Sequence, residues 1–185
     1  MSLGFKRILC PVDMSPFSQE AIKLGVQFAQ SSDATLYLLH VIDNPFDDLY
    51  MSSFTQADPA LLDLYKDEPA RRARIMTATL EHSQVLLKQF CHAWVDPLPK
   101  VRYLVVNGNP FEKIVDAATD YRIDLIVLAT HGRTGVKRLL IGSVAEKVVR
   151  HAPCPVLTIK PGKLRLASRK SAAAGAKSKS SKPSI

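Results

Sequence analysis

The feature that most constrains the fold of this chain is an alternation of short apolar runs with segments of helical periodicity. Apolar runs that do not alternate with polar residues are typical of strands buried on both faces of a parallel sheet. The runs predict strands at 8–12, 35–41, 101–106, 125–129 and 155–159. The segments between them place apolar residues on one helical face and predict helices at 16–29, 70–92, 111–118 and 143–151. The alternation therefore predicts an α/β domain with a mainly parallel sheet.

Local signals refine these boundaries. Ser15 and Pro16 suit the N-cap and first residue of the first helix. From 44 to 69 the periodicity fades, which predicts a long connection with one short helix at 60–65. In the last helix, Val144, Val148 and Val149 are expected to face the core.

The end of the chain differs in composition from the rest. Residues 161–185 are rich in Ser, Ala and Lys and lack aromatic residues, which predicts a disordered tail after a domain spanning 1–160. The net charge is +8, and seven of those charges lie in the tail, so residues 1–160 carry only +1. A specific nucleic-acid partner is therefore not predicted. No secretory signal or membrane-length apolar stretch is evident, and a cytoplasmic protein is expected.

The cysteines and histidines do not form a metal motif. Cys10, Cys91 and Cys154 are widely spaced, with no CxxC pair, so neither a zinc site nor a redox motif is indicated. Cys10 is expected to be a small buried residue of the first strand. His40 and His131 lack neighbouring carboxylates or thiolates at ligand spacing, so ordinary polar or core roles are preferred.

Candidate ligand-binding residues follow three of the predicted strands. In an open parallel sheet, ligands collect at the carboxyl ends of the strands where the strand order reverses. Asp13 follows the first strand, Val41 ends the second, and the segment from Ala129 leaves the fourth. These places are expected to converge on one crevice. For Asp13, the alternative is a cap for the first helix or for the turn around Ser15.

The segment 129–160 has features of an anion site. Gly132 and Gly135 permit close approach of the backbone to a ligand, and Gly142-Ser143 opens a helix whose first N–H groups favour an anion. Basic residues at 133, 137 and 138 add positive charge. The alternative is structural, since residues 143–146 read S-x-x-E, a capping box that accounts for Ser143 without a ligand. There is no Walker A sequence, and spacing alone leaves both interpretations open.

Several of these stretches, taken together, resemble the universal stress protein family. The resemblance rests on ILCPVDMSPFS near the start, NGNPFEKIVDAA, the spacing of Gly132 to Gly142-Ser143, and HAPCPVLTIK, and it spans residues 4–160. The first glycine of the family's Gly-x-x-Gly-x9-Gly-Ser/Thr pattern is Ala129 here. The resemblance implies a Rossmann-like fold of the adenine nucleotide alpha hydrolase kind. Its five parallel strands lie in the order 3-2-1-4-5, with helices on both faces. It also implies a homodimer paired through the last strand, 155–159.

The family's nucleotide-binding members imply a site for ATP, with Mg²⁺. By that resemblance the adenine lies near Val41, Asp13 reaches the ribose or the metal, and the glycine loop with the Gly-Ser step holds the phosphates. The nucleotide-binding residues expected here are Pro11, Val12, Asp13, Ser15, Val41, Ala129, His131, Gly132, Arg133, Gly142, Ser143 and Val144. The methyl group of Ala129 either crowds the ligand or is tolerated.

The function expected from these features is a homodimeric, nucleotide-dependent switch in stress response that acts through a protein partner. The alternative is a dimeric interaction module of the same family that binds no nucleotide. An ATP-using synthetase of a related fold is disfavoured, because the loop CPVDMSPFS lacks the glycines such enzymes carry after the first strand. No catalytic constellation is evident, so at most slow ATP hydrolysis is expected.

Overall fold

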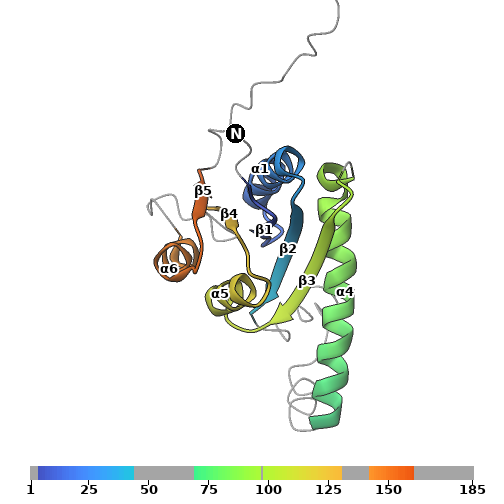
Figure 1. The fold of residues 1–185 in the computed structure, drawn as a ribbon. Coiled ribbons are helices and arrows are strands. Elements are labelled where there is room, and N and C mark those ends of the chain that lie inside the picture. Colours follow the sequence, from blue (N-terminus) through green and yellow to red (C-terminus); the bar gives the residue numbers. More distant parts are fainter. Residues whose placement is uncertain (1–3, 44–68, 97, 131–141, 161–185) are drawn as a thin grey trace, which may run out of the picture.

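The computed structural model describes residues 4–43, 69–96, 98–130 and 142–160. Strands and helices alternate along the chain, as the sequence predicts (Figure 1). The elements are β1 (Arg7–Pro11), α1 (Pro16–Ser32), β2 (Thr35–Ile42), α4 (Pro69–Val95), β3 (Val101–Asn107), α5 (Pro110–Asp120), β4 (Leu125–Ala129), α6 (Ser143–His151) and β5 (Val156–Ile159). The predicted short helix at 60–65 and the predicted tail at 161–185 lie outside the described residues.

The five strands form one parallel sheet in the order β3-β2-β1-β4-β5, which confirms the predicted topology. One face of the sheet packs against α1 and α4, and the other packs against α5 and α6 (Figure 1). Because β1 and β4 are covered on both faces, their residues Ile8, Leu9 and Ile126 are fully buried. This burial explains why these strands read as continuous apolar runs.

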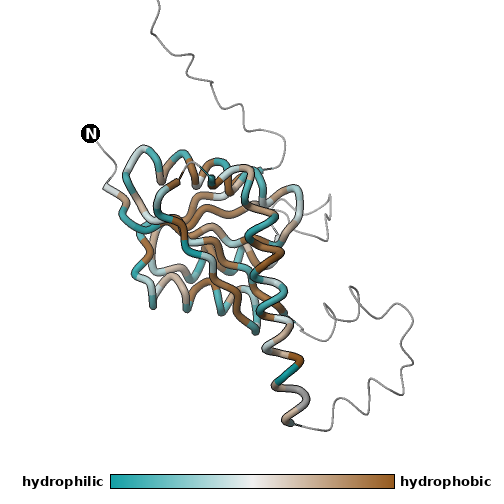
Figure 2. The backbone as a smooth tube through the Cα atoms, turned by 90° about the vertical axis from the view of Figure 1, so that its right-hand side faces the viewer, coloured by the Kyte–Doolittle hydropathy of each residue, from teal (hydrophilic) through white to brown (hydrophobic). Residues whose placement is uncertain are grey.

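The helices differ from the sequence-based expectation in two places. Helix α4 ends at Val95 and its N-terminal part extends past the rest of the domain (Figure 2). In α6, Ala145 and Val148 are the buried residues, whereas Val149 is 48% exposed. The expectation that Val149 faces the core is wrong, because one helical face is too narrow to bury both of two adjacent valines. Within the described part of the chain, none of the helices is long and apolar enough to cross a membrane.

Two of the three thiols lie deep in the core. Cys10 and Cys91 are both 0% exposed, which confirms the buried role predicted for Cys10. Burial raises the pKa of Cys91 to about 12. The pKa of Cys10 is raised still more, mainly by its complete burial and to a smaller extent by the nearby Cys91 thiol. Cys154 is only half-buried, and its pKa is raised mainly by partial burial.

These environments predict selective thiol chemistry. In the folded protein at pH 8, we expect one thiol per chain, Cys154, to react with an aromatic disulfide reagent, and three after denaturation. Stability should fall as the pH rises above about 9, because unfolded thiols ionise near a pKa of about 8.5 while the folded ones stay protonated. Thermal unfolding measured from pH 7 to 11 checks this direction. Rapid reaction of Cys10 or Cys91 in the folded protein would contradict the packing.

Candidate functional site

The two central strands separate at their carboxyl ends. β1 pairs with β2 from Arg7 through Pro11, but its register with β4 covers only Ile8 opposite Leu125 and Leu9 opposite Ile126. Beyond these pairs, the described residues form no β1–β4 pairing at the carboxyl edge. This is also where the order of the sheet reverses, since β2 and β3 lie on one side of β1 and β4 and β5 lie on the other. Such a point is the usual ligand crevice of an open parallel sheet.

Asp13 lies just beyond β1 and organises the turn into α1. Its Oδ1 accepts hydrogen bonds from the Ser15 hydroxyl at 2.6 Å and the Ser15 N–H at 3.0 Å. Ser15 is the N-cap of α1, as predicted, and its Oγ accepts from the Ser18 N–H at 3.4 Å. The structural alternative for Asp13, a turn around Ser15, is therefore confirmed. Both bonds to Ser15 use the same carboxylate oxygen, Oδ1.

The residues around Val12 connect the ends of β1 and β2. The Val12 N–H donates to the Leu39 carbonyl at 2.8 Å, and the His40 Nδ1 lies 2.7 Å from the Val12 carbonyl. His40 is 6% exposed, so its expected polar core role is confirmed. Val41 follows in β2, half-buried, on the face that packs against α5 and α6. The site residues predicted on β1 and β2 thus sit at adjacent strand ends.

The start of α6 differs from the predicted capping box. The N-cap is Gly142, Ser143 is the first helical residue, and no side chain among the described residues caps the helix. The Glu146 carboxylate pairs instead with Arg150 at 2.9 Å. The capping-box interpretation of Ser143 is therefore wrong. Since Ser143, Val144 and Ala145 are the first residues of the helix, their N–H groups have no carbonyl one turn earlier to bind.

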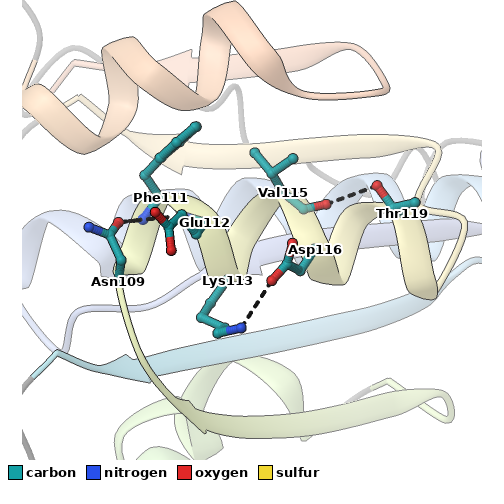
Figure 3. A network of polar contacts seen from close by, with 7 residues as sticks. All are labelled: Asn109, Phe111, Glu112, Lys113, Val115, Asp116 and Thr119. Atoms are coloured by element: carbon teal, nitrogen blue, oxygen red, sulfur yellow. Dashed lines mark hydrogen bonds and ion pairs between the residues drawn. The ribbon is translucent and has the colours of Figure 1, made fainter.

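Helices α1 and α5 also start at this edge, and each is closed by a side chain. Ser15 caps α1, and at α5 the Asn109 Oδ1 accepts from the N–H groups of Phe111 and Glu112 at 3.0 and 3.5 Å (Figure 3). Asn and Ser are preferred N-cap residues because their side-chain oxygens satisfy these donors. With glycine at its N-cap, α6 receives no cap from that residue's side chain. Its first N–H groups and the positive end of its dipole lie at the carboxyl edge of the sheet, an arrangement that favours an anion.

The N-terminus of α6 is held against the end of β4. The Gly142 N–H donates to the Thr130 carbonyl at 2.6 Å. A Cβ at residue 142 would lie 3.0 Å from that oxygen, so the contact favours glycine although its φ is an ordinary −68°. Ala129, the last residue of β4, is half-buried and pairs with Ile159. The structure thus brings Ala129, Gly142 and Ser143 close to one another.

The rest of the predicted anion site follows β4 directly in the sequence. His131, Gly132 and Arg133 lie outside the described residues, as do Gly135 and the basic residues at 137 and 138. Within the described ranges, no group of three His, Cys, Asp or Glu side chains is placed to hold a metal ion.

An open hollow of about 410 Å³ lies elsewhere, between α4 and β3. Its lining includes His92, Val101 and Tyr103 but none of the predicted site residues. The hollow is therefore separate from the place where the pairing of β1 and β4 ends.

Sequence reasoning did not single out Thr130. Its carbonyl accepts from Gly142, while its N–H and hydroxyl both donate to the Ile159 carbonyl, at 2.9 and 3.2 Å. A β-branched hydroxyl residue directly after a buried strand was the available signal. The pattern gave no indication that its partners would come from α6 and β5, because these contacts depend on the chain returning at residues 142 and 159.

Comparison with known proteins identifies the family. The model of the universal stress protein family matches residues 4–160. Universal stress protein MJ0531 of Methanocaldococcus jannaschii is 32% identical over 160 residues, covering 86% of this chain and 84% of that protein. The solved universal stress protein UspA of Lactobacillus plantarum is 30% identical, with a TM-score of 0.62 over 84% of this chain and 97% of its own.

A universal stress protein solved in complex with cAMP has the same fold, with a TM-score of 0.55 at 20% identity over 85% of this chain and 98% of its own. The family match, the sequence relatives and the shared sheet order agree with one another. The chain belongs to the universal stress protein family.

Proposed function

We propose that this universal stress protein binds ATP, with Mg²⁺, in the crevice between the ends of β1 and β4. The observation that carries the proposal is the N-terminus of α6, which no described side chain caps and which the Gly142–Thr130 contact holds at the point where the sheet order reverses. Free N–H groups and a helix dipole favour phosphate oxygens. The fold accommodates an adenine nucleotide in the relative solved with cAMP.

The proposed roles follow from the positions of the described residues and, for residues 131–133, from the family resemblance. Ser143 and Val144 donate their N–H groups to phosphate, and Val41 at the end of β2 packs against the base. Asp13 offers its Oδ2 to a ribose hydroxyl or to a Mg²⁺ water shell, while its Oδ1 stays on Ser15. Pro11, Val12 and Ser15 shape the same edge, and His131, Gly132 and Arg133 complete the phosphate contacts.

Binding, rather than turnover, is the proposed activity. The groups assigned to phosphate are backbone donors, and the one carboxylate assigned to the site, Asp13, already accepts two hydrogen bonds from Ser15. ATP would therefore act by favouring one conformation over another. The protein would then report nucleotide occupancy, in the cytoplasm, to a protein partner that recognises the occupied form.

Ala129 gives a direct test of the non-nucleotide alternative. Its side chain lies on the face covered by α1, like that of Val127, because alternate residues of a strand share a face. Val41, which is proposed to contact the base, lies on the opposite face. We expect Ala129→Gly to change the Kd for Mg-ATP by less than about threefold, and to lower stability by about 1 kcal/mol. Calorimetric titration of both proteins checks this. A tightening of tenfold or more would mean that the alanine obstructs the site, and would favour an interaction module that has lost nucleotide binding.

We also propose that the chain is a homodimer joined through β5. This strand is the edge of the sheet and pairs only with β4 in the described residues. The carbonyls of Pro155 and Ile159 face β4, so the backbone groups of Val156 and Thr158 face outward, because these directions alternate along a strand. An open row of donors and acceptors is suited to pairing with a second copy.

Thr158→Pro is expected to weaken this dimer, because proline removes an outward N–H without removing a bond to β4. In a two-fold interface both copies lose a donor, so dissociation should become roughly 30-fold easier. Thr158→Val keeps the N–H and serves as the control. Sedimentation velocity over a dilution series measures the effect. An unchanged dimer in the proline variant would exclude pairing through this edge.

The ligand itself can be identified by its phosphates. Protein purified without added nucleotide is denatured, and the released small molecules are separated by chromatography. The stripped protein is then titrated with AMP, ADP and ATP. Affinity should rise with each added phosphate if the N–H groups of α6 hold the phosphate chain. Equal affinity for all three would place the phosphates elsewhere.

A further inference from the structure

Thr130 forms hydrogen bonds to the α6 N-cap on one side and to β5 on the other. Its carbonyl accepts from the Gly142 N–H at 2.6 Å, and its N–H and Oγ1 donate to the Ile159 carbonyl at 2.9 and 3.2 Å. Thr130 is 3% exposed and Ile159 is 5% exposed. Water cannot readily replace bonds at such buried positions, so these bonds are costly to break.

The geometry leaves little freedom for the three residues to move separately. The N–H and the hydroxyl of Thr130 both donate to the Ile159 carbonyl, and this double contact fixes the backbone and the χ1 angle of Thr130. The χ1 angle of a β-branched residue is already restricted. Gly142 approaches the Thr130 carbonyl so closely that even a methyl group would need a small displacement. A shift of Gly142 must therefore move the Thr130 carbonyl and, through Thr130, the end of β5.

We propose that Thr130 is a positioning residue that couples anion binding at the α6 N-terminus to the order of β5. This regulation rests on the proposed function, because ATP is the anion that would occupy the site. Phosphate bound to the N–H groups of Ser143 and Val144 holds Gly142 in place, and Thr130 carries that constraint to Ile159. Since coupling between two sites is reciprocal, pairing of the β5 edge also tightens the nucleotide site.

The test compares variants that differ by the Thr130 hydroxyl. Thr130→Val removes the hydroxyl at nearly constant shape, and Thr130→Ser retains it. Thr119→Val is the matched control, because the Thr119 Oγ1 donates to the Val115 carbonyl at 3.1 Å on exposed α5, away from the crevice (Figure 3). Amide hydrogen exchange of residues 156–160 is followed in the full chain by mass spectrometry. It is measured without nucleotide and at equal occupancy by Mg-ATP.

In the unsubstituted protein and in Thr130→Ser, Mg-ATP should slow exchange of residues 156–160 by about tenfold, a typical size for coupling between sites. In Thr130→Val the slowing should drop to about twofold or less, and Thr119→Val should behave as the unsubstituted protein. A purely structural role for Thr130 would change the melting temperature but not this nucleotide-dependent difference. Undiminished protection of residues 156–160 in Thr130→Val overturns the proposal.

A second arm uses no nucleotide and separates this inference from the proposed function. Gly142→Ala presses a methyl group against the Thr130 carbonyl. We expect Gly142→Ala to speed exchange at 156–160 in the unsubstituted background and in Thr130→Ser. In the Thr130→Val background its effect there should be much smaller, so the two substitutions should be non-additive.

The two arms fail in different ways. If Gly142→Ala alters exchange only at 142–146, the coupling is absent, whether or not ATP binds. If ATP fails to bind but the effect on 156–160 persists, the proposed ligand is wrong and the coupling stands.

Discussion

Gly142→Val should abolish detectable binding of Mg-ATP while leaving the domain folded. A Cβ at this position lies 3.0 Å from the Thr130 carbonyl, and the branched methyl groups of valine add further crowding. The Gly142 N–H would lose its 2.6 Å bond to Thr130, and the first N–H groups of α6 would shift out of register with a bound phosphate. We expect a loss of affinity of about 100-fold or more, which corresponds to about 3 kcal/mol.

The series Gly142→Ala and Gly142→Val provides the control for this expectation. Alanine needs a displacement of a few tenths of an ångström, so its loss of affinity should be smaller than that of valine. Calorimetry measures binding, and circular dichroism with thermal unfolding verifies the fold. Normal affinity in a folded Gly142→Val protein would show that α6 does not hold the phosphates.

Gly25→Ala should destabilise the fold strongly, because α1 touches β1 at this glycine. An added Cβ would overlap the Cys10 Sγ and lie 3.3 Å from the Leu36 Cδ1, both in fully buried side chains. Overpacking of a core lowers the free energy of unfolding by about 1–3 kcal/mol and occasionally more. The higher helix propensity of alanine relative to glycine offsets up to about 1 kcal/mol of this loss. We expect a net loss of about 2 kcal/mol, seen as a fall in melting temperature of about 5 °C.

A double substitution tests the cause of that loss. In Cys10→Ala the sulfur is gone, and the Cβ of residue 10 would stand 4.0 Å from the new methyl group at residue 25, an ordinary contact. Gly25→Ala should therefore cost much less in the Cys10→Ala background than in the native one. Equal costs in both backgrounds would mean that the cysteine is not what limits the approach of α1 to β1.

The sheet was predictable from the sequence because a strand that is buried on both faces appears as a continuous run of apolar residues. β1 and β4 consist almost wholly of apolar residues, and the Ser15-Pro16 pair marks the start of α1. The strand order came from the family resemblance, since apolar runs alone do not specify neighbours. The boundaries of α4 were less predictable, because its first part extends beyond the sheet, and residues 69–78 include no buried side chain among those described.

The candidate site was predictable in outline and less so in its contacts. Asp13, Val41 and Gly142 lie at the predicted edge because parallel strands end together. The S-x-x-E pattern at 143–146 was misleading, since Gly142 takes the cap position and Arg150 holds the Glu146 carboxylate. The role of Thr130 depends on contacts between segments far apart in sequence, which no local pattern encodes.

The most direct test of nucleotide binding is a calorimetric titration of the stripped protein with Mg-ATP. Saturable binding with one ATP per chain is expected, weakened when Mg²⁺ is withheld and lost in Gly142→Val. The absence of heat and of any competing fluorescent-nucleotide signal, in a protein shown to be folded, would contradict the proposal that this crevice is a nucleotide site.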